Sequence, residues 1–333
     1  MYLAAGRFSS YSCSTSCFSC IFLLCLVIWP WESPGFSIDT HKRFLPLEYQ
    51  TLTTHSDTLI LDIVFSLSTT RSFEEMAPAG LPEFSLSGKV VLVSGAARGL
   101  GLTQAEAVLE AGATVYALDR LDEPSPDFHR VAERAEKELN TSLHYRRIDV
   151  RDAADLNKIV EEIGTKHGRM DGLIAAAGIQ QETPALEYTA EDANRMFEVN
   201  ITGVFMTAQA VAKQMIRFGN GGSMVLIASM SGSVANRGLI CSAYNASKAG
   251  VIQLARNLAA EWGEHNIRVN TISPGYIVTA MVEALFEQYP DRKESWPKQN
   301  MLGRLSKPQE YRGAAVFLLS EASSFMVSSD PWF

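Results

Sequence analysis

Tyr244 and Lys248 stand four residues apart in the segment Ser242–Lys248. The Ala-rich sequence from Ala243 to Gly263 predicts a helix, so both side chains should lie on one face, about one turn apart. A phenol keeps its proton until about pH 10, and a neighbouring ammonium lowers that pKa. Such a pair can act as a general acid or base near neutral pH. The same spacing also describes a surface tyrosine beside a solvated lysine.

A glycine-rich segment lies well upstream of this pair. The apolar run from Lys89 to Ser94 predicts a strand, and a helical pattern follows from Leu102 to Ala111. Glycines between a strand and a helix let the backbone approach a pyrophosphate, which the helix N-terminus attracts. The spacing is G-x-x-x-G-x-G, and a third glycine of the usual fingerprint would fall at Gln104. The strand–turn–helix context favours dinucleotide binding over a tight turn that needs glycine only for its positive φ.

These two motifs and several others, in the same order, resemble the short-chain dehydrogenases/reductases over about residues 84 to 329. The run Ala228–Ser233, together with Tyr244–Lys248, looks closest to fungal polyol and keto-sugar reductases of that family. Ala175 and Ala176 replace the two asparagines that are usual there. The remaining matches follow predicted strands or begin helices, and they are Asp119, Asp149, Asn200, Ser229 and the segment 273–279.

The resemblance implies reversible hydride transfer between a nicotinamide and a small carbonyl or secondary alcohol. Tyr244 would be the acid/base, and Lys248 would lower its pKa and hold the nicotinamide ribose. Ser229 would hydrogen-bond the substrate oxygen, with Ser231 as a rival and a capping role as the simpler reading. Asn200 would hold a water that links Lys248 to solvent, unless it only caps or kinks a helix.

The implied cofactor is NAD(P). Asp119 lies 18 residues after Gly101, where a carboxylate can bind the ribose 2′-hydroxyl and would repel a 2′-phosphate. This favours NAD, but Arg98 and Arg120 flank the same place and keep NADP open. The resemblance assigns the cofactor site to Gly95, Arg98, Gly99, Leu100, Gly101, Asp119, Asp149, Ala176, Tyr244, Lys248, Ile277 and Thr279.

Apolar runs alternate with helical patterns from Lys89 onward. This alternation predicts one α/β domain over residues 76–333, a Rossmann-type doubly wound parallel sheet with helices on both faces. Relatives continue into another strand, so the C-terminal strand is expected to be missing here, which would expose a sheet edge. The predicted strands are 89–94, 113–118, 143–148, 172–177, 223–228 and 267–272. The predicted helices are 102–111, 128–139, 153–167, 189–218 with a break near Asn200, 244–262 and 308–319.

Composition limits the partners. The net charge of −8 and the scattered basic residues argue against nucleic acid. The six histidines are dispersed, and we expect no metal site. Residues 1–75 are expected to be an extension that is signal-like, disordered or a mis-assigned start. The apolar run 20–29 is too short to span a bilayer alone, although it leaves a signal or anchor possible. Sequons at Asn200 and Asn245 beside the catalytic residues favour a cytoplasmic location.

Two further expectations concern assembly and activity. Apolar faces on the helices around 200–218 and 244–262 predict a homodimer or a higher homo-oligomer. The apolar stripe Met281, Val282, Leu285, Phe286 and Tyr289 is either a substrate lid or plain packing. The missing strand also leaves an alternative to the enzyme. The protein could be a catalytically inactive nucleotide-binding or scaffolding member of the family.

Overall fold

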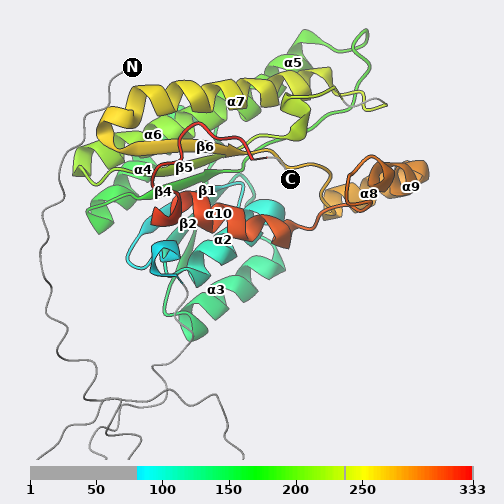
Figure 1. Ribbon diagram of the computed structural model, residues 1–333. Coiled ribbons are helices and arrows are strands. Elements are labelled where there is room, and N and C mark those ends of the chain that lie inside the picture. The colour runs from blue at the N-terminus through cyan, green and yellow to red at the C-terminus, as the bar shows by residue number, and fades with distance from the viewer. Residues whose placement is uncertain (1–80, 236–237, 332–333) are drawn as a thin grey trace, which may run out of the picture. The chain divides into compact units, whose positions relative to one another are not determined.

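The computed structural model describes residues 81–235 and 238–331, without the side chains of residues 280, 281 and 284 (Figure 1). The predicted extension at 1–75 and the side chain of Met281 lie outside this description. Everything below concerns the described residues.

Six parallel strands form one sheet in the order β3-β2-β1-β4-β5-β6. The central strands are continuous apolar runs, as expected for strands with both faces covered. The order reverses between β1 and β4, which makes the carboxyl ends of those two strands the expected ligand-binding edge. The strands are β1 Val90–Ser94, β2 Thr114–Asp119, β3 Leu143–Arg147, β4 Gly172–Ala175, β5 Gly222–Ile227 and β6 Ile267–Ile272.

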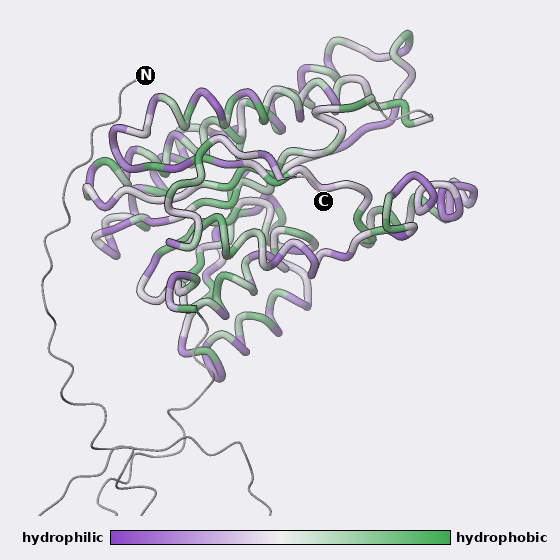
Figure 2. The backbone as a smooth tube through the Cα atoms, viewed as in Figure 1, coloured by the Kyte–Doolittle hydropathy of each residue, from purple (hydrophilic) through white to green (hydrophobic). Residues whose placement is uncertain are grey.

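Helices cover both faces of the sheet, so two hydrophobic cores form (Figure 1). One face carries α4 Ala153–His167, α6 Val204–Phe218 and α7 Ser242–Trp262, and the other carries α2 Gly99–Glu110, α3 Pro126–Glu138 and α10 Arg312–Leu319. Figure 2 shows hydrophobic residues gathered along the strands and hydrophilic ones on the outer turns of the helices. The predicted fold class is confirmed. Three short helices lie near the carboxyl edge: α5 Ala190–Phe197, α8 Ala280–Gln288 and α9 Pro290–Lys298.

The break expected near Asn200 is a π-helical turn, Glu198–Gly203, between α5 and α6. Gly203 belongs to this turn, and a Cβ there would lie 2.6 Å from a methyl carbon of Val150. The missing side chain therefore lets the widened turn pack closely against the end of β3. π-turns inside helices are often found at functional sites.

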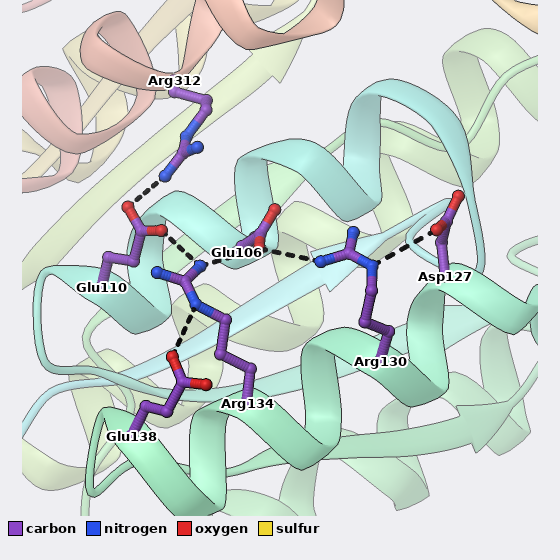
Figure 3. A network of polar contacts seen from close by, with 7 residues as sticks. All are labelled: Glu106, Glu110, Asp127, Arg130, Arg134, Glu138 and Arg312. Carbon is purple, nitrogen blue, oxygen red and sulfur yellow. Dashed lines mark hydrogen bonds and ion pairs between the residues drawn. The ribbon is translucent and has the colours of Figure 1, made fainter.

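A network of ion pairs joins α2, α3 and α10 on the solvent side (Figure 3). Arg134 on α3 donates to Glu106 at 2.9 Å and to Glu110 at 2.6 Å, both on α2. Arg312 on α10 pairs with Glu110 as well. Single surface pairs contribute little to stability, but this shared network connects the helix that follows the glycine-rich turn to both of its neighbours.

Most of the apolar residues that predicted a dimer are core residues of this chain. Val204, Ala208, Val211 and Met215 on α6 are buried against the sheet, as are Val251 and Leu258 on α7. That prediction assumed that these side chains were additional to the inner faces of the helices, and they are the inner faces. Leu254, which also belonged to the set that predicted the dimer, stays partly exposed on α7, as do Phe205, Met206 and Trp262 on the same two helices.

The outer edge of β6 is partly covered by the end of the chain. The backbone N–H of Thr271 donates to the carbonyl of Ser329 at 2.9 Å, and that of Ser273 donates to the carbonyl of Pro331 at 3.0 Å. The Asp330 carboxylate accepts from the hydroxyls of Thr271 and Ser273. The described residues contain no seventh strand, as expected. Residues 329–331 nevertheless run along β6 in the same direction, so fewer backbone groups of this edge strand are left without a hydrogen bond than the sequence predicted.

Candidate active site

The glycine-rich turn lies at the carboxyl end of β1, where the strand order reverses. Gly95 has a φ of 70°, and a Cβ on it would lie 2.7–2.8 Å from backbone atoms of Ala176 and Ala177 after β4. A Cβ on Gly101 would collide with the carbonyl of Gly95. Gly99 has a φ of 62°, with open space where its Cβ would be. At Gly95 and Gly101 the turn thus approaches backbone atoms as closely as only glycine allows, whereas Gly99 faces open space.

Helix α2 begins at Gly99, so its first-turn N–H groups have no partner within the helix. Arg98 is the exposed N-cap residue, and Leu100 is half-buried. A dinucleotide pyrophosphate fits such a cradle, because the N–H groups and the helix dipole both favour an anion. The predicted Gly95, Arg98, Gly99, Leu100 and Gly101 therefore lie together in one turn.

Asp119 ends β2 beside this turn. Its carboxylate accepts from the N–H of Ala97 at 3.1 Å and from the N–H of Leu121 at 3.3 Å. Both bonds hold the carboxylate at the carboxyl edge, next to the cradle. This is a suitable place for binding a ribose hydroxyl.

An open cavity of about 540 Å³ adjoins Asp119 at the ends of β2 and β3. Its walls include Arg120, Asp149 and an ion pair of 3.0 Å between Asp122 and Arg147. Asp149 is engaged by the guanidinium of Arg151, which lowers the pKa of this carboxyl. The predicted residues Asp149 and Arg120 line this cavity, and the Asp122–Arg147 pair is a feature that sequence reasoning missed.

Ser229, Tyr244 and Lys248 converge at the end of β5. The phenol of Tyr244 is hydrogen-bonded to the side chain of Ser229. The ammonium of Lys248 is buried, donates to the carbonyl of Ile227 at 2.7 Å, and lies 5.7 Å from the centre of the Tyr244 ring. Ser229, the preferred of the two rival serines, is thus a partner of Tyr244. Its hydroxyl also accepts from the N–H of Ser231 at 3.2 Å, so the capping role is present as well.

The protonation of this pair differs from the sequence expectation. Burial raises the pKa of Tyr244, and the hydrogen bond from Ser229 offsets this only in part. Burial also lowers the pKa of Lys248 to about 8. The ammonium is directed at a backbone carbonyl rather than at the phenol oxygen, and desolvation outweighs its attraction for a phenolate. The raised pKa favours the protonated form of Tyr244, and of the two groups it is Lys248 whose pKa falls toward the neutral range.

Asn200 is fully buried in the π-turn and bridges two parts of the site. Its amide exchanges two hydrogen bonds of 2.9 Å with the backbone of Ile179 and donates to the hydroxyl of Ser247 at 3.0 Å. That hydroxyl donates to the carbonyl of Tyr244 at 2.7 Å. The side chain of Asn200 thus connects the loop after β4 to the first turns of α7.

The comparisons with known proteins agree with this arrangement. A family model described as enoyl-(acyl carrier protein) reductase matches residues 95–330. A short chain dehydrogenase/reductase, notP′ of Aspergillus versicolor, is 40% identical over 74% of this chain and 86% of its own length. D-arabinitol 2-dehydrogenase (ribulose-forming) of Candida albicans is 34% identical over 73% of this chain and 90% of its own.

Among solved structures, a gluconate 5-dehydrogenase from Burkholderia cenocepacia in complex with NADP and tartrate is 32% identical. It has a TM-score of 0.69 and covers 76% of this chain and 96% of its own. This chain belongs to the short-chain dehydrogenase/reductase family. It is therefore an NAD(P)-dependent oxidoreductase of alcohol and ketone substrates, and the inactive alternative is not favoured.

The other predicted cofactor residues of this family member follow β4 and β6. The N–H of Ala176 donates to the carbonyl of Ser94 at 3.1 Å, which fixes it beside the glycine-rich turn. Ile277 forms a parallel bridge with Ser306, and Thr279 caps α8 by accepting from the N–H of Val282. Ile277 and Thr279 thus lie where the chain leaves the sheet for α8.

Helix α9 was not predicted, and its residues Arg292 and Trp296 are ones that sequence reasoning missed. Trp296 stacks on Tyr276, with ring centres 4.1 Å apart, and meets Phe286 edge-on at 5.6 Å. Arg292 forms an ion pair with Glu182 in the loop after β4. The polar sequence of 290–298, with proline at both Pro290 and Pro297, carries no apolar periodicity that could have revealed this helix.

Nowhere in the described residues do three or more metal-ligating side chains gather as a candidate ion site. No described helix combines the length and the apolar character needed to cross a membrane.

Proposed function

We propose that this protein interconverts a polyol and the corresponding keto-sugar, with Tyr244 transferring the proton. The observation that carries this proposal is the hydrogen bond between Tyr244 and Ser229 at the carboxyl end of β5. It pairs two hydroxyls that can both reach one substrate oxygen, at the edge of the sheet where the cofactor cradle lies. Relatives named for polyols, among them the arabinitol dehydrogenase, support this substrate class.

The residues divide the reaction between them. The nicotinamide, when bound, supplies or accepts the hydride. In reduction, Tyr244 donates its proton to the developing alkoxide, and the raised pKa of the phenol keeps that proton available at neutral pH. Ser229 donates a hydrogen bond to the same oxygen and stabilises its charge. Lys248 holds the ribose and favours the phenolate when the reaction runs toward the ketone. In this scheme Asn200 orients the turn that carries Tyr244.

The packing of α8 and α9 supports a polar substrate. Phe286 and Trp296, which could have formed a hydrophobic substrate wall, pack on each other, and Trp296 also stacks on Tyr276. The loop after β4 contributes polar side chains, including Gln181, Glu182 and Thr183. A wall of this kind suits a hydroxylated chain better than an apolar ketone.

The test is a steady-state assay of the full chain with NAD⁺ and with NADP⁺ on D-arabinitol, galactitol and mannitol. Cyclohexanol and a long-chain secondary alcohol serve as apolar comparisons. We expect a higher kcat/KM for at least one polyol than for either apolar alcohol. Oxidation of the apolar alcohols alone would refute the polyol assignment and leave the family assignment intact.

We propose that NAD is the preferred cofactor, because the Asp119 carboxylate would repel a 2′-phosphate. Asp119→Ala should shift the ratio of kcat/KM values toward NADP by about tenfold or more, since close like charges cost several kcal/mol. Asp122→Ala is the matched control, because this exposed carboxylate lies in the adjoining cavity and pairs with Arg147. An Asp119→Ala ratio equal to that of wild type would show that Asp119 does not face the ribose.

We also propose a homodimer formed through α6 and α7. Their partly exposed Phe205, Met206, Leu254 and Trp262 support it. Light scattering that finds a monomer at micromolar concentration would overturn it.

A cytoplasmic location is proposed because Asn200, one of the two sequon asparagines, is fully buried and hydrogen-bonded. Cell fractionation of the full chain tests this.

A further inference from the structure

A largely buried ion pair joins two distant segments beside the proposed substrate site. Arg292 on α9 donates to both carboxylate oxygens of Glu182, at 2.9 and 2.7 Å. Only 13% of the Arg292 side chain and 16% of the Glu182 side chain are exposed. Paired, two-point contacts of this kind are among the stronger charged hydrogen bonds in proteins. The 110 residues between the partners make the pair a tertiary tether rather than a local one.

The arginine is held in place by aromatic rings. Its guanidinium lies 4.1 Å from the ring centre of Tyr289 and 5.4 Å from that of Trp296. Trp296 is 7% exposed and stacks on Tyr276, with 12° between the ring planes. Tyr276 directly precedes Ile277, one of the predicted cofactor residues. The tether therefore extends from Glu182 through α9 to the segment that leaves β6.

The glutamate is anchored near the catalytic tyrosine. The N–H of its neighbour Thr183 donates to the carbonyl of Ile240 at 2.8 Å. Ile240 comes two residues before α7, and Tyr244 lies in the first turn of that helix. The ion pair thus connects the two chain segments that flank Tyr244, namely the loop after β4 and the helices after β6.

Among the described residues, helices α8 and α9 pack chiefly on each other, and Trp296 adds its stacking on Tyr276. In Figure 1 the two helices project beyond the carboxyl edge of the sheet. At their base, the bridge between Ile277 and Ser306 attaches them to the domain. Loss of the ion pair should therefore release this helical pair without disturbing the two cores.

We propose that Glu182 and Arg292 are positioning residues for substrate binding. Their ion pair holds α8–α9 against the loop after β4 and so determines how tightly a substrate is retained at Tyr244. The proposal rests on the proposed function only in placing the substrate at Tyr244.

The test is a double-mutant cycle in the full chain with Glu182→Gln, Arg292→Ala and the double variant. The first readout is hydrogen exchange of residues 280–300. The second is the set of substrate KM, kcat and cofactor Kd. Each single variant should raise hydrogen exchange in residues 280–300 and raise the substrate KM about tenfold, because breaking a buried ion pair is costly. The cofactor Kd should stay within about twofold of the wild-type value. The double variant should be no worse than Arg292→Ala, because both changes remove one interaction.

Arg304→Ala provides the matched control. Arg304 also makes a two-point ion pair, with Glu310, but that pair is exposed and joins residues only six positions apart. We expect wild-type KM and wild-type exchange in 280–300 for this variant. Unchanged exchange in the Glu182 and Arg292 variants would overturn the tether. Raised exchange with an unchanged KM would overturn its role in substrate binding.

The two proposals fail in different ways. If the wild-type protein oxidises only apolar alcohols, the polyol assignment is wrong, but exchange and the KM for those alcohols still test the tether. If polyols are oxidised and additive effects appear in the cycle, the polyol assignment stands and the tether is wrong.

Discussion

Replacing Tyr244 by phenylalanine should reduce turnover by about a hundredfold or more in both directions, because general acid–base catalysis contributes about 10²–10⁴. The phenol is bonded to Ser229, and its raised pKa keeps it protonated at neutral pH, so the ketone loses its proton donor. Because the ring is retained, the packing of α7 should persist. Cofactor Kd, measured by NADH fluorescence titration, should stay within about twofold of wild type, since the cradle lies at β1.

Tyr116→Phe is a suitable control for this variant. Tyr116 is a buried tyrosine on β2, and its hydroxyl is hydrogen-bonded to His167 at 2.8 Å, with no part in the proposed site. Its loss should affect stability more than turnover. Near-normal kcat in Tyr244→Phe, with NADH bound normally, would refute the role assigned to the phenol.

Lys248→Met should move the pH profile of alcohol oxidation upward by about one unit or more, because an adjacent cation favours an anion by about that amount. Oxidation needs the phenolate, and burial already raises the pKa of Tyr244. Met removes the cation that lies 5.7 Å from the centre of the Tyr244 ring and would stabilise a phenolate there. Cofactor Kd should rise as the contact with the ribose is lost. Lys213→Met, at an exposed position on α6, is the control. An unchanged pH profile in Lys248→Met would contradict the assignment.

The same substitution should not lower stability at neutral pH. Burial lowers the pKa of Lys248 from 10.5 to about 8. Between these values the unfolded chain binds a proton that the folded chain has released, so the wild type gains stability as pH rises. The cost of the buried charge is therefore present below pH 8 and disappears toward pH 10.5. We expect the Tm of Lys248→Met to equal or exceed that of wild type at pH 7 and this advantage to shrink by pH 10. A Tm well below wild type at pH 7 would show that the bond to Ile227 outweighs this cost.

The pattern of the sequence predicted the sheet and the helices that cover its two faces, and it assigned the candidate site to the carboxyl ends of the strands. Apolar runs and helical periodicity are local signals, and short connections leave little freedom in how such elements assemble. Gly95 and Gly101 were recognisable for a related reason, since a close backbone approach excludes every other residue type there. The break at Asn200 was also predicted, although its π-turn was not.

The tertiary structure alone decided the protonation of Tyr244 and Lys248, the buried state of the α6 and α7 faces, and the Glu182–Arg292 pair. Desolvation depends on every neighbour that excludes water, so the spacing of Tyr244 and Lys248 cannot reveal which effect dominates. An apolar stripe shows that a helix face is buried but not whether the sheet or a second chain covers it. The partners Glu182 and Arg292 are 110 residues apart, and only the folding of the chain brings such charges together.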